Sequence, residues 1–119
     1  MSDIVEWVPE LDVAEGKPDD LKALMQKMSD ATQADEPGTL TYEWCIDSIG
    51  SKSHIIERYA DSHAVMVHLG NFGTKFADRF MAILTPTALA VYGPASGQVQ
   101  AALGSFGPVH YRLLGGVHR

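Results

Sequence analysis

Residues 39–60 read TLTYEWCIDSIGSKSHIIERYA, and this stretch predicts a β-hairpin. Large apolar side chains recur at every second position from Leu40 to Ile46, which is the period-2 pattern of a strand over residues 39–47. A turn around Gly50 follows, and residues 53–60 form a second candidate strand. Because the link between the two strands is short, we expect them to pair antiparallel.

The register of this hairpin depends on the centre of its turn. A turn symmetric about Gly50 pairs residues whose numbers add to about 100. This register pairs Tyr42 with Arg58, Trp44 with Ile56, and Ile46 with His54. Since a shift of one residue would move every side chain to the other face of the sheet, the register is a hypothesis for the structure to test.

Helices and strands alternate on both sides of the hairpin. The pattern of apolar residues predicts a strand over 4–11, a helix over 18–34, a long helix over 61–84, a strand over 85–92, a short helix over 98–106 and a last strand over 108–117. The long helix carries a continuous apolar stripe with a period near 3.6, formed by Val65, Leu69, Phe72, Phe76, Phe80 and Leu84.

The element order β-α-β-β-α-β is that of an α+β, ferredoxin-like fold, in which a four-stranded antiparallel sheet carries both helices on one face. The other face of the sheet would be open, yet the strands place apolar residues on both faces. An uncovered apolar face is a partner site. We therefore expect a homodimer that buries sheet against sheet, with the last strand a candidate to cross to the partner.

Length and composition place the chain among small globular proteins. Its 119 residues predict one domain over 1–119, with a core at 4–92 and a C-terminal helix and strand at 96–119. A net charge of −6 argues against nucleic acid or an acidic membrane as a partner. Cys45 is the one cysteine, so no internal disulfide can form. With no signal-peptide pattern at the start, the expected location is the cytoplasm.

His68 is the side chain best placed for chemistry. It lies four residues before Phe72 on the long helix, at the edge of the aromatic stripe that faces the sheet. One interpretation is a half-buried histidine bonded to a carbonyl or carboxylate. The other is a titratable group at the mouth of an apolar pocket between helix and sheet. The five histidines have no metal-ligand spacing, so we expect no metal.

A family resemblance appears at the same residues. The pattern Glu57-Arg58-Tyr59-x-Asp61-x-x-Ala64-x-x-x-His68 resembles the central signature of the antibiotic biosynthesis monooxygenase domain family. The run from Glu36 to Tyr42 is similar to the glycine-led second strand of that family. The resemblance covers about residues 4–92. It departs from the common pattern after His68, where many members have a second histidine and this chain has Asn71-Phe72-Gly73.

The resemblance implies a dimeric α+β barrel and three possible functions. Some members oxygenate aromatic polyketides or quinols without metal or flavin, and others degrade haem. The haem-degrading branch uses an asparagine in the first strand, whereas the one asparagine here is Asn71. We therefore expect a monooxygenase without a cofactor that oxidises a small phenol or quinol with O2. The alternatives are a non-catalytic binder of a small hydrophobic ligand and another enzyme of the dimeric α+β barrel type.

Seven residues are candidates for the site of such a reaction. His68 is the candidate proton acceptor, and Arg58 is a candidate partner for a substrate anion, although it could instead pair with Glu57 or Glu43 on the surface. The candidate substrate-binding residues, which could equally be plain core, are Tyr42, Trp44, Tyr59, Phe72 and Phe76. The expected ligand is a small aromatic molecule in a dry pocket.

Overall fold

A computed structural model describes residues 2–119, so Met1 of the predicted domain lies outside the described residues. The elements in chain order are β1 (Val5–Val13), α1 (Pro18–Asp35), β2 (Thr39–Ile46), β3 (Lys52–Tyr59), α2 (Ser62–Lys75), α3 (Ala77–Ile83), β4 (Leu84–Tyr92), α4 (Gly97–Leu103), the 3-10 turn η1 (Gly104–Phe106) and β5 (Val109–Tyr111). Except for the break between α2 and α3 and the length of β5, this order matches the sequence prediction.

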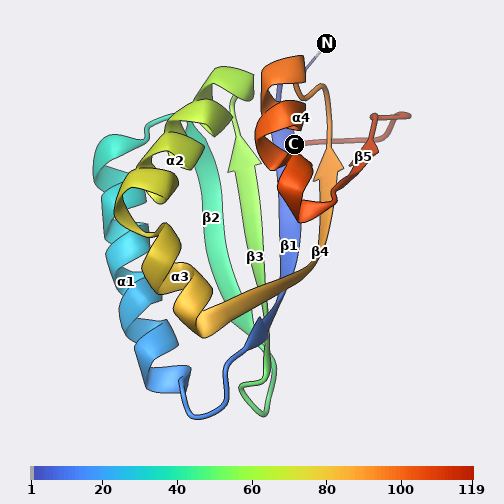
Figure 1. Cartoon of the computed structure of the whole chain (residues 1–119). Coiled ribbons are helices and arrows are strands. Elements are labelled where there is room, and N and C mark those ends of the chain that lie inside the picture. The colour runs from blue at the N-terminus through green and yellow to red at the C-terminus, as the bar shows by residue number, and fades with distance from the viewer. Residues whose placement is uncertain (1) are drawn as a thin grey trace.

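One mixed sheet forms the base of the molecule, with strand order β2-β3-β1-β4-β5. The first four strands pair antiparallel, and β5 joins β4 in parallel. The helices α1, α2, α3 and α4 cover one face of this sheet (Figure 1). The predicted α+β, ferredoxin-like fold is confirmed.

The predicted register of the hairpin is wrong by one residue. Tyr42 pairs with Glu57, and Trp44 pairs with Ile55, so the paired numbers add to 99. The cause is the turn, which has four residues between Asp47 and Lys52. The Asp47 carboxylate accepts hydrogen bonds from Ser51 and Lys52 and holds the loop. Tyr42 and Glu57 therefore share the face that the helices cover.

The predicted helix over 61–84 is two helices. The chain leaves helical geometry at Phe76, which has φ −129° and ψ −14°, and α3 begins at the next residue. This break lets the aromatic stripe turn toward the sheet, where Phe72 and Phe80 pack edge to face with ring centroids 5.1 Å apart. None of the helices within residues 2–119 is long and apolar enough to cross a membrane.

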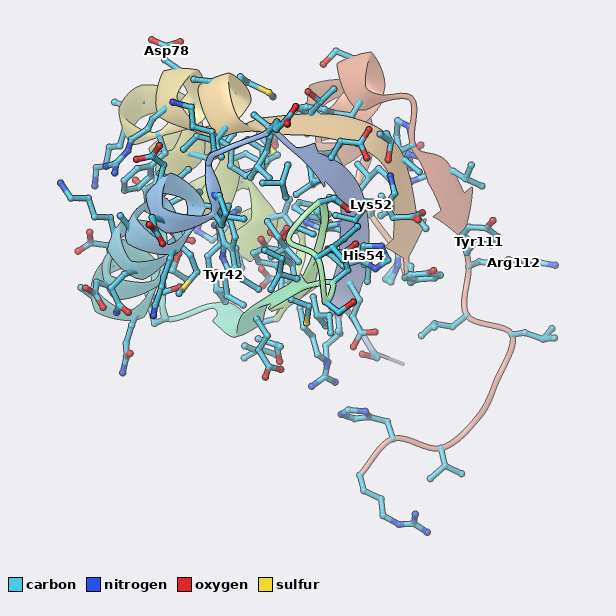
Figure 2. All side chains as sticks on the ribbon, turned by 90° about the horizontal axis from the view of Figure 1, so that it is seen from below. Tyr42, Lys52, His54, Asp78, Tyr111 and Arg112 are labelled. Carbon is cyan, nitrogen blue, oxygen red and sulfur yellow. The ribbon has the colours of Figure 1, made fainter. Side chains whose placement is uncertain are left out.

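The last predicted strand is much shorter than expected. Only Val109–Tyr111 pair with β4, and residues 112–119 form no regular structure. We call residues 112–119 the C-terminal arm. Figure 2 shows the arm running away from the body after Arg112.

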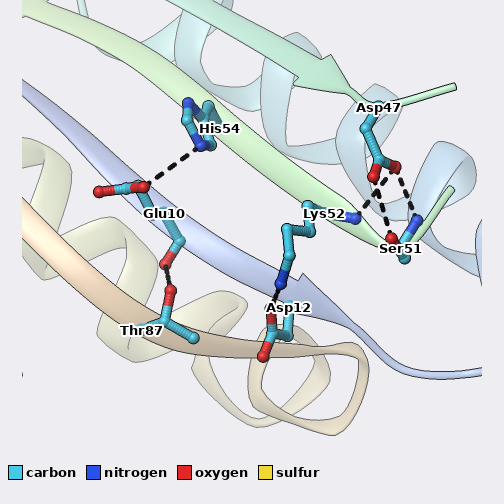
Figure 3. A network of polar contacts seen from close by, with 7 residues as sticks. All are labelled: Glu10, Asp12, Asp47, Ser51, Lys52, His54 and Thr87. Atoms are coloured by element: carbon cyan, nitrogen blue, oxygen red, sulfur yellow. Dashed lines mark hydrogen bonds and ion pairs between the residues drawn. The ribbon is translucent and has the colours of Figure 1, made fainter.

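The two faces of the sheet differ in composition. The helix-covered face carries two buried clusters, one around Trp7, Tyr59 and Val65 and the other around Leu24, Ile55 and Phe80. The opposite face, which we call the open face, is crossed by exposed ion pairs, among them Lys52 to Asp12 at 2.7 Å and the weaker His54 to Glu10 contact at 3.6 Å (Figure 3). The open face is therefore more polar than the alternation of apolar residues predicted.

Candidate functional site

A cavity of about 80 Å³ lies between the sheet and the helices, where the two buried clusters meet. Apart from Tyr42, Glu57 and His68, its lining side chains are apolar: Trp7, Pro9, Leu11, Met28, Ile55, Leu69, Phe72, Phe80, Met81, Pro86, Ala88, Leu89, Leu103 and Phe106. Met81 is 44% exposed and lies at the rim. An apolar cavity with a few polar groups is the usual form of a small-molecule site.

The polar residues at the cavity belong to a chain of close contacts between buried side chains, formed by Glu36, His68 and Glu57. His68 Nδ1 is 2.7 Å from Glu36 Oε1, and His68 Nε2 is 3.3 Å from Glu57 Oε1. The three side chains are at most 7% exposed. The imidazole thus bridges two carboxylates that lie on opposite sides of it, and these carboxylates do not converge on a common point.

The two carboxylates set the charge of His68. Burial alone would lower the pKa of the imidazole, but the hydrogen bonds and charges of Glu36 and Glu57 outweigh burial and raise the pKa to about 9. For Glu36 both effects have the opposite sign. Burial would raise the pKa of its carboxyl group, but the contact with His68 lowers this pKa below its ordinary value. At neutral pH Glu36 is therefore a carboxylate and His68 an imidazolium.

Glu36 reaches this position because of how α1 ends. Its backbone N–H closes the last turn of α1 by bonding to the Thr32 carbonyl. Its side chain then points into the protein, where it also accepts hydrogen bonds from Thr39 Oγ1 at 3.2 Å and from Asn71 Nδ2 at 3.3 Å. These donors satisfy a buried carboxylate that would otherwise be costly.

A close packing contact brings α2 down onto the start of β2. A Cβ added at Gly38 would lie 2.6 Å from the Ala64 Cβ, so only glycine fits there without a shift. Asp61 caps the helix by accepting a hydrogen bond from the Ala64 N–H at 2.8 Å. The signature residues Asp61 and Ala64 thereby fix where His68, one turn later, meets Glu36.

The hydroxyl group of Tyr59 holds the Glu57 carboxylate in place. Tyr59 is fully buried, and its hydroxyl donates to Glu57 Oε1 at 2.5 Å. Both this bond and the His68 contact use Oε1. Within residues 2–119, Glu57 Oε2 has no hydrogen-bond partner, and it is not sealed from the cavity that Glu57 lines. The group available to a ligand is therefore a carboxylate oxygen.

Tyr42 stands beside the same polar group. Its ring centroid is 5.1 Å from that of His68. Burial first, and then the charge of Glu57, raise the pKa of the phenol far above its ordinary value. Tyr42 consequently keeps its proton over the whole working range of pH and can donate a hydrogen bond to a ligand oxygen.

The structure brings together some of the seven candidate residues. His68, Tyr42 and Phe72 line the cavity. Tyr59 lies behind Glu57 and does not line it. Two further candidates, Trp44 and Phe76, pack against the cluster around Phe80 and are not among the lining residues. Within this subunit both are partly buried and pack against the core, the alternative that the sequence left open.

The placement of Arg58 corrects the prediction that it shares the cavity. Its side chain lies on the open face, where Arg58 Nε is 2.7 Å from Glu6 Oε1. The predicted alternative partners, Glu57 and Glu43, are not its partners either. The one-residue error in register is the reason, because in the true register Glu57 takes the helix-covered face and Arg58 the other.

Two functional candidates do not stand out in the sequence. The local pattern marks Glu36 only as part of the Glu36-Pro37-Gly38 helix stop, and Glu57 only as a member of the signature. A signal for Glu57 is present, because the alternating series Ile55, Glu57, Tyr59 has apolar members on both sides of a carboxylate. No local signal marks Glu36, whose partner His68 is 32 residues further along the chain.

Comparison with known proteins shows the fold. No family model matches the chain, and no curated protein sequence matches it. MupZ from Pseudomonas fluorescens has a similar structure, with a TM-score of 0.85, 21% sequence identity, and coverage of 98% of this chain and 94% of that one. Because so little of this chain is left out, the likeness to MupZ includes its C-terminal elements.

Shorter proteins share the core. SnoaB, a cofactor-independent oxygenase from Streptomyces nogalater, has a TM-score of 0.66 at 18% identity and covers 80% of this chain and 96% of its own. A proposed antibiotic biosynthesis monooxygenase from Caulobacter crescentus has a TM-score of 0.65 at 18% identity, covering 76% and 86%. The chain has the fold of antibiotic biosynthesis monooxygenase domains, as the sequence resemblance implied.

Proposed function

We propose that the protein is an oxygenase that removes a proton from a small neutral aromatic substrate in the cavity and lets the resulting anion react with O2, with no bound cofactor. The observation that carries this proposal is Glu57, a buried carboxylate at the one polar place in an apolar cavity. The fold shared with SnoaB supports it.

In this proposal Glu57, and not His68, accepts the proton. An imidazole with a pKa of about 9 already carries its proton at neutral pH, so it has no lone pair to offer. Its role becomes electrostatic. As an imidazolium beside Glu36 and Glu57, His68 is the one cationic group among the described residues that line the cavity, and it favours negative charge on a ligand nearby.

A suitable substrate has an acidic methylene group, such as that of an anthrone-type phenol, and one O2 molecule is enough to oxidise it. Glu57 takes one proton, and the substrate anion passes one electron to O2, which gives a substrate radical and superoxide. The two combine to a peroxide anion, which takes the proton back from Glu57 and becomes a hydroperoxide. Loss of water from it leaves a carbonyl group, so that the methylene group and one O2 become a ketone and one water molecule. Tyr42 donates a hydrogen bond to the oxygen that carries the anion.

The cavity limits what can bind without rearrangement. A cavity of about 150 Å³ holds one benzene molecule, and this one is about 80 Å³. A substrate with one or more rings therefore has to displace side chains at the rim. Met81 is suited to this movement because its side chain is exposed, unbranched and flexible.

Oxygen uptake with a panel of hydroquinones and anthrone-type phenols tests the proposal. We expect Glu57→Gln to lower the rate by about 10²- to 10⁴-fold, the usual contribution of a positioned base. The matched control is Glu43→Gln, which removes an exposed carboxylate from β2 and should leave the rate unchanged. Equal rates for wild type and Glu57→Gln would exclude Glu57 as the proton acceptor.

The second candidate function is a non-catalytic binder of a small hydrophobic ligand, favoured by the predominantly apolar lining of the cavity. It predicts that an aromatic ligand raises the melting temperature of the protein without product formation. A third possibility, another enzyme of the same barrel type, predicts a product other than the oxygenated one. Product analysis on the same panel separates all three.

A further inference from the structure

The cavity extends across four neighbouring strands of the sheet. Of its lining residues, Tyr42 lies on β2, Glu57 on β3 and Leu89 on β4, and β1 runs between the last two strands. Because neighbouring strands are about 4.8 Å apart, the cavity is roughly 14 Å long. A volume of about 80 Å³ spread over this length has the shape of a narrow channel.

The two ends of this channel differ in polarity and in exposure. The inner end, at β2 and β3, holds the polar lining residues Tyr42, Glu57 and His68. Glu57 and His68 are only 5% and 6% exposed, so this end is largely closed. The outer end lies between α3, β4 and η1, where Met81 is 44% exposed and Phe106 is partly exposed. A ligand therefore enters beside Met81 and reaches Glu57 last.

The outer end of the channel is built from a segment without charged residues. Residues 80–109 contain no Asp, Glu, Lys or Arg, although these types make up 20% of the chain. This segment supplies Met81, Pro86 and Phe106 to the lining. Asp78 and Arg79 precede it on α3, but neither lines the cavity, and Figure 2 shows Asp78 pointing away from the body. An ion on a ligand would find no partner in this segment, and burying it would be costly.

The width of the channel favours a linear group over a second ring. A cavity that holds one benzene molecule is about 150 Å³, almost twice the volume of the whole channel. One ring fits if the flexible side chains of Met28 and Met81, which both line the channel, move aside. A fused second ring would also have to separate Phe72 from Phe80, which pack edge to face. A hydrocarbon chain is narrower than a ring and displaces less.

We propose that the ligand of this channel is a single electron-rich phenol ring that carries a linear, uncharged hydrocarbon chain. The ring lies at Glu57 and Tyr42, a placement that rests on the proposed function, and the chain leaves between Met81 and Phe106. A single phenol ring satisfies the proposed reaction, because its keto form has an acidic methylene group. Met81 and Phe106 then determine specificity: they accept an apolar chain and reject a carboxylate or phosphate on it.

Titration calorimetry with phenol, para-ethylphenol, para-butylphenol and para-hexylphenol tests the linear chain. We expect the affinity to rise about fourfold for each added methylene group, which corresponds to about 0.8 kcal/mol of apolar burial. Para-octylphenol and anthrone have the same number of carbon atoms, and we expect para-octylphenol to bind more tightly. An affinity that does not rise with chain length, or tighter binding of anthrone, would overturn the proposal.

A charge placed on the chain tests the uncharged outer end. A carboxylate at the end of the chain of para-butylphenol should weaken binding to the wild type more than tenfold. Met81→Lys places an ammonium group at the outer end and should reduce this difference at least tenfold. The matched control is Val67→Lys, at a 37% exposed position on α2 that does not line the cavity, and it should leave the difference unchanged. Equal differences in the wild type and Met81→Lys would contradict the proposed path of the chain.

These binding measurements involve no oxygen uptake, so they separate this inference from the proposed function. A protein that oxidises phenols, but whose affinity does not depend on chain length, retains the proposed function and refutes the inference. A protein whose affinity rises with chain length, but which oxidises none of the phenols, supports the inference and favours the non-catalytic binder.

Discussion

A histidine–glutamate contact lies on each side of the sheet, and the two contacts differ in their surroundings. On the helix-covered face His68 lies 2.7 Å from Glu36, with side chains 7% and 4% exposed. On the open face His54 lies 3.6 Å from Glu10, and both side chains are about half exposed (Figure 3). Water screens the second pair and is excluded from the first. The same residue types therefore form a buried charged pair on one side of the sheet and a weak surface contact on the other.

The largest effect should come from removing each histidine in turn. His68→Ala leaves Glu36 and Glu57 buried without their cation, and we expect a loss of about 3–5 kcal/mol in the free energy of unfolding. His54→Ala on the open face should cost less than about 1 kcal/mol. Urea denaturation at pH 7 measures both. Similar losses for the two variants would mean that burial does not distinguish the contacts.

The buried contact should also make stability depend on pH. The pKa of His68 is about 9 in the folded chain and 6.5 as an ordinary side chain. Because the pKa of His68 is raised in the folded chain, its contribution to the free energy of unfolding is complete below pH 6.5 and is lost as the pH rises through 9. The difference between the two pKa values corresponds to a contribution to the free energy of unfolding on the order of 3 kcal/mol.

Urea unfolding between pH 6 and pH 10 measures this loss, with His68→Gln as the reference. Both proteins share their lysines and tyrosines, so the difference between their curves reports on His68 and its contacts with Glu36 and Glu57. A wild-type curve parallel to that of His68→Gln over this range would contradict a raised pKa.

Much of this molecule is predictable from the sequence because its signals are local. The hairpin, the order of the elements and the inward direction of His68 follow from the periodicity of nearby residues. The register does not, because it depends on how Asp47 holds the turn. Gly50 has φ +73° and is the third of the four loop residues rather than the centre of the loop.

The composition of the candidate site is harder to predict because it depends on the register and on tertiary contacts. A shift of one residue exchanges the faces of Glu57 and Arg58, so the side chain expected in the cavity is the one outside it. The Glu36–His68 contact requires the packing of α2 on β2, which no short stretch of sequence encodes. For Trp44 and Phe76 the sequence does not separate core from cavity, because both environments favour aromatic residues.

A smaller effect should come from Gly38, at the contact between β2 and α2. Gly38→Ala places a Cβ against Ala64, and we expect a loss of about 1–3 kcal/mol from overpacking. The shift also moves Glu36 away from His68, so the pH dependence of stability should weaken. An unfolding free energy equal to that of the wild type would show that α2 can move away from β2 without loss of stability.

The smallest effect is expected at Gly70, on the exposed side of α2. A Cβ there meets no atom within 4 Å. Gly70→Ala should therefore stabilise the protein, by about 0.5–1 kcal/mol, through the better helix propensity of alanine. Denaturation of this variant beside Gly38→Ala compares a glycine required by packing with one that is not, and a loss of stability at Gly70 would contradict the comparison.

The Gly38–Ala64 contact also constrains how this chain can diverge. The two positions share a volume that holds one methyl group, so a larger residue at either is tolerated only if the other position stays small or the helix moves outward. Among homologous sequences, the pair should accordingly vary together, and lineages in which it has enlarged should have lost the carboxylate at position 36 as a partner for the histidine.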